Sequence, residues 1–125
     1  MYQYNPAKGP KPKDWLAIDE SARLDLIYEF HEEHGEFGES METHATIHAV
    51  VETQLAMDVP NARDALVRLR KSGLTRHDAI YAIGSVLAEH LHELVHNRDV
   101  QSSEVNSRYY ERLRSFTKED WFSES

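Results

Sequence analysis

"METHATIHAVVETQLA", residues 41–56, carries the helical pattern from which the fold class of this chain can be predicted. Its apolar residues Ile47, Val51 and Leu55 recur every four positions, which keeps them on one face of an α-helix of about 3.6 residues per turn. A half-buried strand would instead show apolar residues at every second position, and no such alternation stands out in the chain. The pattern therefore predicts a helix over 41–57 that buries one face.

Four further segments combine helical spacing with residues that begin or end helices. Asp19 is a suitable N-cap, Thr75 with Asp78 resembles a capping box, and Gly73 suits a helix end. The five predicted helices span 19–34, 41–57, 61–72, 76–97 and 103–116. The residues expected inside are Ile47, Val51, Leu55, Ile80, Leu87 and Leu91. The prediction is an all-α fold, a small helical bundle of about five helices.

The 125 residues are enough for a single domain with one hydrophobic core. Residues 1–13 contain three of the four prolines, so they are predicted to form an extended N-terminal arm. Residues 19–97 are predicted to form the helical core, and residues 98–125 a loop followed by a terminal helix.

The composition narrows the classes of partner. The formal net charge of −8 disfavours nucleic acid, because a polyanion is repelled by an acidic surface. No apolar stretch approaches the roughly 20 residues of a membrane span, and no secretory signal follows the N-terminal lysines. We therefore expect a cytoplasmic protein that binds no membrane. The chain has no cysteine and eight histidines, so any metal must be held by imidazole and carboxylate groups.

Ionisable residues lie along the border of the face that the helix over 41–57 is expected to bury. His44, His48 and Glu52 follow one another at intervals of four residues. Two histidines one helical turn apart can chelate one metal ion, and a carboxylate one turn further can join or orient them.

The helix predicted over 76–97 carries a comparable edge, which begins with His77 and Tyr81. The small residues Gly84 and Ala88 follow on the same edge. This order of large and small side chains indicates either close helix packing or the floor of a pocket.

We predict that His44, His48 and His77 hold one divalent ion, zinc or iron. Glu52 would be a fourth ligand or a general base, and Tyr81 would lie beside an open coordination position. The alternative is a hydrogen-bonded polar core without a metal. Each uncompensated buried polar group costs about 1 to 3 kcal/mol, and a shared ion would satisfy all of them at once.

His31 and Glu20 lie on the inward face of the helix over 19–34. They are eleven residues apart, about 16 Å along the axis, so they cannot share one ion. His31 is a further candidate ligand, although taken alone it is interpreted as a hydrogen-bonded core residue. A single ion is favoured over two. His90 and His92 are expected at the surface.

The segments "HATIHAVVETQLA" (44–56) and "LRKSGLTRHDAIYAIGSVLAEHL" (69–91) resemble the pattern HxxxHxxVExQ followed by RHxAIHxI. This pattern is typical of an uncharacterised family of small, histidine-rich helical proteins of bacteria, a domain of unknown function. The resemblance covers residues 19–97, leaves both tails unmatched and implies no established activity. One departure is Tyr81, which stands where the family pattern has a histidine. It implies a phenolate ligand, one ligand fewer, or a hydroxyl over an open position.

The sequence is compatible with two classes of function. The first is a metalloprotein or metalloenzyme acting on a small-molecule substrate. The second is a non-catalytic bundle with a structural or protein-interaction role, held by a buried His/Glu network and able to form a homodimer. The helix over 76–97 is apolar over a broad arc that includes Ala79 and Val86. Either the helix over 103–116 or a second subunit is expected to cover this arc.

Overall fold

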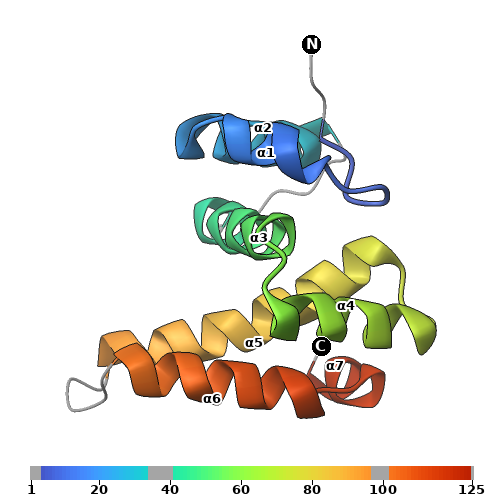
Figure 1. Cartoon of the computed structure of the whole chain (residues 1–125), viewed down its shortest axis with the longest axis vertical. Coiled ribbons are helices and arrows are strands. Elements are labelled where there is room, and N and C mark those ends of the chain that lie inside the picture. The colour runs from blue at the N-terminus through green and yellow to red at the C-terminus, as the bar shows by residue number, and fades with distance from the viewer. Residues whose placement is uncertain (1–3, 34–40, 97–101, 125) are drawn as a thin grey trace.

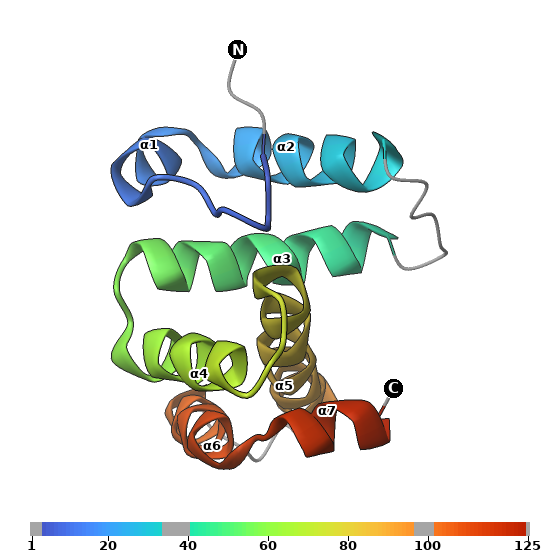
Figure 2. The same cartoon turned by 90° about the vertical axis from the view of Figure 1, so that its right-hand side faces the viewer.

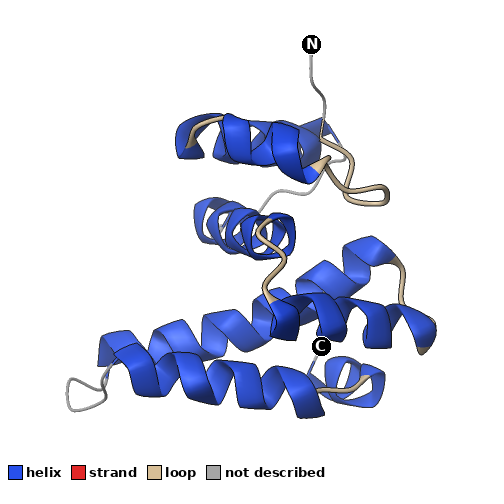
Figure 3. Cartoon of the chain, in the orientation of Figure 1, coloured by secondary structure: helices blue, strands red, loops and turns tan. Residues whose placement is uncertain are grey.

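The computed structural model describes residues 4–33, 41–96 and 102–124, with side chains from 4–31, 44–93 and 107–122. The described residues form helices joined by loops and turns and contain no strand (Figure 3). The helices are α1 (Pro12–Ala17), α2 (Glu20–Glu33), α3 (Met41–Ala56), α4 (Pro60–Lys71), α5 (Arg76–His96), α6 (Ser102–Ser115) and α7 (Lys118–Glu124). The predicted all-α bundle is confirmed. The described residues contain seven helices rather than five, because α1 and α7 were not predicted.

The residues expected to begin and end helices do so. The Asp19 carboxylate accepts a hydrogen bond from the Ala22 backbone N–H at 2.8 Å, and the Thr75 hydroxyl accepts one from the Asp78 N–H at 3.1 Å. These bonds satisfy N–H groups in the first turns of α2 and α5, which have no partner within their own helix. Gly73 follows α4 with a φ of 114°, a conformation that residues with a Cβ rarely adopt.

The helices form successive layers. Figures 1 and 2 show α1 and α2 at one end of the molecule, α3 beside them, and α4 to α7 on the other side of α3. Helix α5 runs roughly across α3. Two clusters of buried residues correspond to these layers. The small core joins the N-terminal segment, α1, α2 and α3, and contains Tyr4, Trp15, Ile27, Ala45 and Ala49. The large core joins α3 to α7, and its members include Val51, Leu69, Ile80, Ile83, Val86, Leu113 and Phe116.

Most of the predicted core residues are inside. Val51, Ile80 and Leu87 are buried, and Ile47 and Leu55 are partly buried against the large core. Leu91 is an error of prediction, since 40% of its surface is exposed.

His90 was also predicted wrongly, because it is buried, whereas His92 is exposed as expected. Position 90 lies on the face of α5 that carries Ala79 and Val86. Helix α6 covers this face, and the His90 ring lies 6.1 Å from the Tyr109 ring. The apolar arc of α5 is thus covered within the chain rather than left for a second subunit.

The described part of the predicted extended arm, residues 4–13, packs against the rest of the molecule. Residues from Pro12 onward form α1, and the side chain of Tyr4 is 2% exposed in the small core. Burying a tyrosine removes a large apolar area from water and holds the segment in place. Within the described ranges of the chain, every helix falls short of the length and apolar character that crossing a membrane would require.

Candidate metal centre

Three histidines from three different helices meet between the two cores. His31 lies in α2, His48 in α3 and His77 in α5, and one ring nitrogen of each lies within 4.8 Å of the others. Two nitrogens bound to one tetrahedral zinc ion are about 3.4 Å apart. Ring shifts of less than about 1 Å would therefore bring the three nitrogens to bonding distances. The three histidines lie close enough together to bind one metal ion.

The partners of the His31 ring determine which of its nitrogens carries the proton. Nδ1 lies 2.7 Å from the carbonyl oxygen of Ile27, one turn earlier in α2. A carbonyl oxygen can only accept, so Nδ1 is the protonated nitrogen and Nε2 carries the lone pair. The Tyr81 hydroxyl donates to this Nε2 at 2.7 Å. A metal-binding imidazole commonly donates its other N–H to a backbone carbonyl, which fixes the ring in the orientation required.

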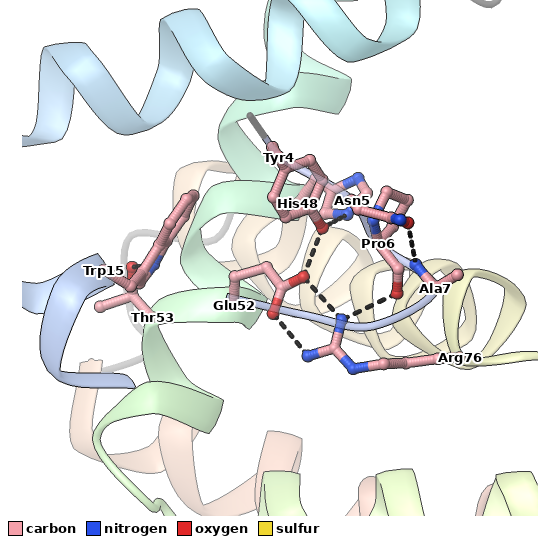
Figure 4. A network of polar contacts seen from close by, with 9 residues as sticks. All are labelled: Tyr4, Asn5, Pro6, Ala7, Trp15, His48, Glu52, Thr53 and Arg76. Atoms are coloured by element: carbon pink, nitrogen blue, oxygen red, sulfur yellow. Dashed lines mark hydrogen bonds and ion pairs between the residues drawn. The ribbon is translucent and has the colours of Figure 1, made fainter. Parts of the chain in front are cut away.

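The His48 ring is held by a chain of hydrogen bonds that begins at Glu52 (Figure 4). The Tyr4 hydroxyl lies between the two side chains and has one proton to donate. It donates to the Glu52 carboxylate, which can only accept, and its oxygen accepts from Nε2–H of His48 at 2.6 Å. The lone pair of His48 is then on Nδ1. This nitrogen is buried and has no hydrogen-bond partner in the part of the chain that the structure describes.

Arg76 neutralises the buried carboxylate. Its two terminal nitrogens donate to the two oxygens of Glu52 at 2.9 and 2.8 Å, in the paired geometry that suits a guanidinium and a carboxylate. The side chains of Glu52 and Arg76 are only 1% and 10% exposed. Burial disfavours the charged form of Arg76, but the bonds to Glu52 outweigh it, so the pKa of Arg76 lies above its usual value.

The N-terminal segment encloses this ion pair. The Pro6 carbonyl oxygen accepts a hydrogen bond from Arg76 at 2.9 Å. Gly9 has a φ of 76°, and a Cβ added there would overlap the central carbon of the Arg76 guanidinium. Only a glycine allows the loop to approach the guanidinium so closely. The segment 4–11 is therefore shaped around Arg76.

The electrostatic surroundings keep two members of this network neutral. Burial, followed by the neighbouring histidines and Arg76, lowers the pKa of His48 well below its usual value. Burial and the Glu52 charge raise the pKa of Tyr4 far above its usual value. Neutral imidazole is the form that binds metal ions, so His48 would lose no proton on binding one near neutral pH.

The structure places in one region the five predicted ligands, of which Glu52 was also predicted to be catalytic, and Tyr81. Among the described residues, the group of three contains His31, His48 and His77, while His44 and Glu52 are outside it. The centroid of the His44 ring nevertheless lies 5.0 Å from that of the His31 ring and 4.6 Å from that of the Tyr81 ring. Tyr81 also stacks on His77, with ring centroids 4.5 Å apart.

His31 and Glu20 occupy opposite ends of α2, as their spacing requires. His31 is fully buried among the other rings, while Glu20 is exposed in the first turn. The position of His31 is compatible with both predictions for it. Both of its ring nitrogens have hydrogen-bond partners, as expected of a core residue, and one of them lies close to nitrogens of His48 and His77, as expected of a ligand.

Tyr4 and Arg76 are the residues of the site that the sequence reasoning missed. Arg76 belongs to the RHxAI segment, and a buried Glu52 indicates a cation near it, which is the signal that this residue offered. Tyr4 had no such signal, because it lies 44 residues from His48 in a segment rich in proline and glycine.

No family model, curated protein or solved structure matched the chain, so its function has to be inferred from the geometry of this site.

Proposed function

We propose that this protein binds one divalent transition-metal ion, zinc or iron, through the imidazoles of His31, His48 and His77. The observation that carries the proposal is the approach of three ring nitrogens to within 4.8 Å of one another, from three helices. Imidazole ligands suit zinc and iron alike.

The hydrogen bonds around the rings support this assignment. His31 and His48 each use one nitrogen as a donor, to the Ile27 carbonyl and to Tyr4, and each retains a lone pair on the other. Leaving the buried Nδ1 of His48 without a partner costs free energy, which a metal ion would recover. The Tyr4–Glu52–Arg76 network then has the role of the outer groups that orient metal-binding histidines in other proteins.

The number of ligands favours an open site. Structural zinc sites are usually closed by four protein ligands, whereas catalytic sites keep one position for water or substrate. Three neutral imidazoles leave the charge of the ion undiminished, so a bound water would be strongly acidified. Metal binding at Nε2 of His31 would displace the Tyr81 hydroxyl, which would then be available to a bound water or a small-molecule substrate. On this basis we extend the proposal to a metalloenzyme.

Two predicted ligands have other places in the proposal. His44 remains an alternative fourth ligand, because its ring contacts both His31 and Tyr81. Glu52 is assigned to orienting His48 through Tyr4 rather than to binding the ion or acting as a base, because both of its oxygens accept from Arg76, one also accepts from Tyr4, and it lies outside the group of three.

The second candidate function is a metal-free bundle with a structural or interaction role. The observation that favours it is that Glu52 and both nitrogens of His31 already have hydrogen-bond partners within the protein. In this case the thermal stability would not depend on a metal ion.

Metal analysis of the protein purified without a histidine tag tests the proposal. We expect about one equivalent of zinc or iron, lost in each of the variants His31→Ala, His48→Ala and His77→Ala. The variant His92→Ala is the matched control, since His92 is exposed and outside the group, and it should retain the metal. An unaltered melting temperature in a strong chelator, together with no metal in the purified protein and no zinc uptake, would support the metal-free bundle instead.

A further inference from the structure

A cavity of about 240 Å³ lies beside the histidine group, between α3, α5 and α7. We propose that it binds a small aromatic molecule that carries one hydroxyl head group, of the size and chemistry of phenol. The inference goes beyond the metal site, because binding in this cavity requires only the protein's own side chains.

The apolar walls of the cavity determine the size and character of the ligand. Ile47 from α3, Ile80 from α5 and Trp121 from α7 form much of its lining, together with the small residue Ala88. An apolar cavity of about 150 Å³ holds one benzene molecule in another protein, so this larger space accepts a substituted benzene ring. The indole of Trp121 adds an aromatic surface on which such a ring can pack.

The close approach of two helices explains why the cavity has a defined floor. Gly84 of α5 lies against α3 so closely that an added Cβ would be 3.1 Å from a methyl group of Ile47. Beyond this contact, Ala88 has too short a side chain to fill the space between α5 and α7. The two small residues therefore have different roles: Gly84 permits close helix packing, and Ala88 leaves the cavity open.

The lining of the cavity also contains polar side chains, some of which belong to the histidine group or lie against it. His48 belongs both to the lining and to the group of three, and His44 and Tyr81 also line the cavity. Ser85 also lines the cavity, but its hydroxyl proton is donated to the Ala82 carbonyl. A hydroxyl group can both donate to and accept from imidazole and phenol side chains, so one hydroxyl on the ligand suits this part of the lining. Pockets with mostly apolar walls and a few polar groups are typical of small-molecule sites.

Titration of phenol into the metal-free protein, in the presence of a chelator, tests the inference. The indole N–H signals of the two tryptophans can be followed by two-dimensional NMR and assigned with the variant Trp121→Phe. We expect the Trp121 signal to shift as phenol binds, with a dissociation constant for phenol of about 1 mM. Trp15 is an internal control, because it is buried in the small core, away from the cavity lining, and its signal should stay in place.

Two comparisons make the test specific. Ala88→Leu fills the cavity and should weaken phenol binding at least about tenfold, whereas Ala17→Leu, the same change at an exposed position of α1, should not. Toluene, which lacks the hydroxyl, should bind about three to ten times more weakly than phenol.

Phenol binding that Ala88→Leu leaves unchanged, or no phenol binding at all, would overturn the assignment of this cavity. Equal binding of toluene would overturn the role of the head group. Zinc uptake is measured separately on the same variants, so a failure of the metal site and a failure of the cavity give different results.

Discussion

Single residues determine which groups of the site carry protons and charge. Glu52 is ionised and paired with Arg76. The Tyr4 hydroxyl donates to Glu52 and accepts from Nε2–H of His48, so the lone pair of His48 lies on Nδ1. Each of these states depends on the one before it. Substitutions along this chain of bonds should therefore have different effects. At the end with Glu52 and Arg76 they should lower the stability of the protein, and at the end with Tyr4 and His48 they should lower its affinity for the metal.

Glu52→Gln should lower the free energy of unfolding by about 3 to 5 kcal/mol, because it leaves the guanidinium of Arg76 without a carboxylate in a largely buried position. Adding Arg76→Met should recover part of this loss, since the uncompensated charge is then removed. Urea denaturation of the two variants measures both effects. The control is Glu89→Gln, an exposed site on α5, which should change the stability by less than about 0.5 kcal/mol. A loss of similarly small size for Glu52→Gln would contradict the importance of the ion pair.

Tyr4→Phe should weaken zinc binding about 10- to 100-fold while leaving the fold intact. The phenyl ring keeps the packing against Trp15 and Phe30, but the hydroxyl that orients His48 is lost. Calorimetric titration of zinc measures the affinity, and Tyr110→Phe on α6 controls for the removal of a tyrosine hydroxyl elsewhere. If Tyr4→Phe bound zinc as tightly as the unsubstituted protein, Tyr4 would not position His48.

The metal-free protein should lose stability as the pH falls below about 6.5. The pKa of His48 is lower in the folded than in the unfolded protein, so acid protonates the unfolded chain first. The contribution of His48 to the free energy of unfolding is therefore complete above the unfolded pKa of about 6.5. It is lost as the pH falls below this value, at up to about 1.4 kcal/mol per pH unit. Denaturation with urea in a chelator at several pH values measures this slope. His48→Gln should flatten it and His92→Gln should not; an equal slope in all three proteins would refute the assignment.

At the scale of elements, the N-terminal segment 4–11 is part of the site rather than an appendage. Tyr4 enters the small core, Pro6 accepts from Arg76, and Gly9 passes closely over the same guanidinium. Gly9 in this segment thus serves a specific packing role. Helix α7 also contributes more than packing, because its Trp121 forms a wall of the cavity beside the histidine group.

Gly9→Ala should destabilise the protein by about 2 kcal/mol, because alanine disfavours a φ of 76° and its Cβ would overlap the Arg76 guanidinium. Ala7→Gly, an exposed change in the same loop, is the control for altered loop flexibility. Thermal unfolding of both variants measures the difference. Equal stability of Gly9→Ala and the unsubstituted protein would mean that the loop can leave Arg76 without cost.

At the scale of the whole molecule, the three histidines connect the two cores. His31 belongs to α2 on the side of the small core, His77 to α5 in the large core, and His48 to α3 between them. A metal ion bound to all three would therefore join α2 to α5 across α3. Binding to the folded state alone stabilises a protein by about 4 kcal/mol at a ligand concentration of 1,000 times the dissociation constant.

Zinc should therefore slow amide hydrogen exchange in α2 more than in α6, since α6 is held in the large core without any of the three ligands. Exchange measured by mass spectrometry with zinc and with chelator tests this expectation. In His77→Ala the effect of zinc on α2 should disappear. Equal protection of α2 and α6 by zinc in the unsubstituted protein would indicate global stabilisation rather than a link between the cores.

The extent to which sequence predicts this protein follows from the range of the interactions involved. Helical periodicity and caps such as Asp19 and Thr75 are local, so they predict the all-α class and five of the helices. The inward position of His48 and Glu52 also follows from spacing along α3. Contacts between helices depend on how faces meet, and periodicity does not contain that information. Only the tertiary structure therefore placed His31 beside His48 and His77, paired Glu52 with Arg76, and covered His90 rather than Leu91 with α6. The burial of Tyr4 is the clearest case, because its partners lie more than 40 residues away and nothing in its local sequence specifies them.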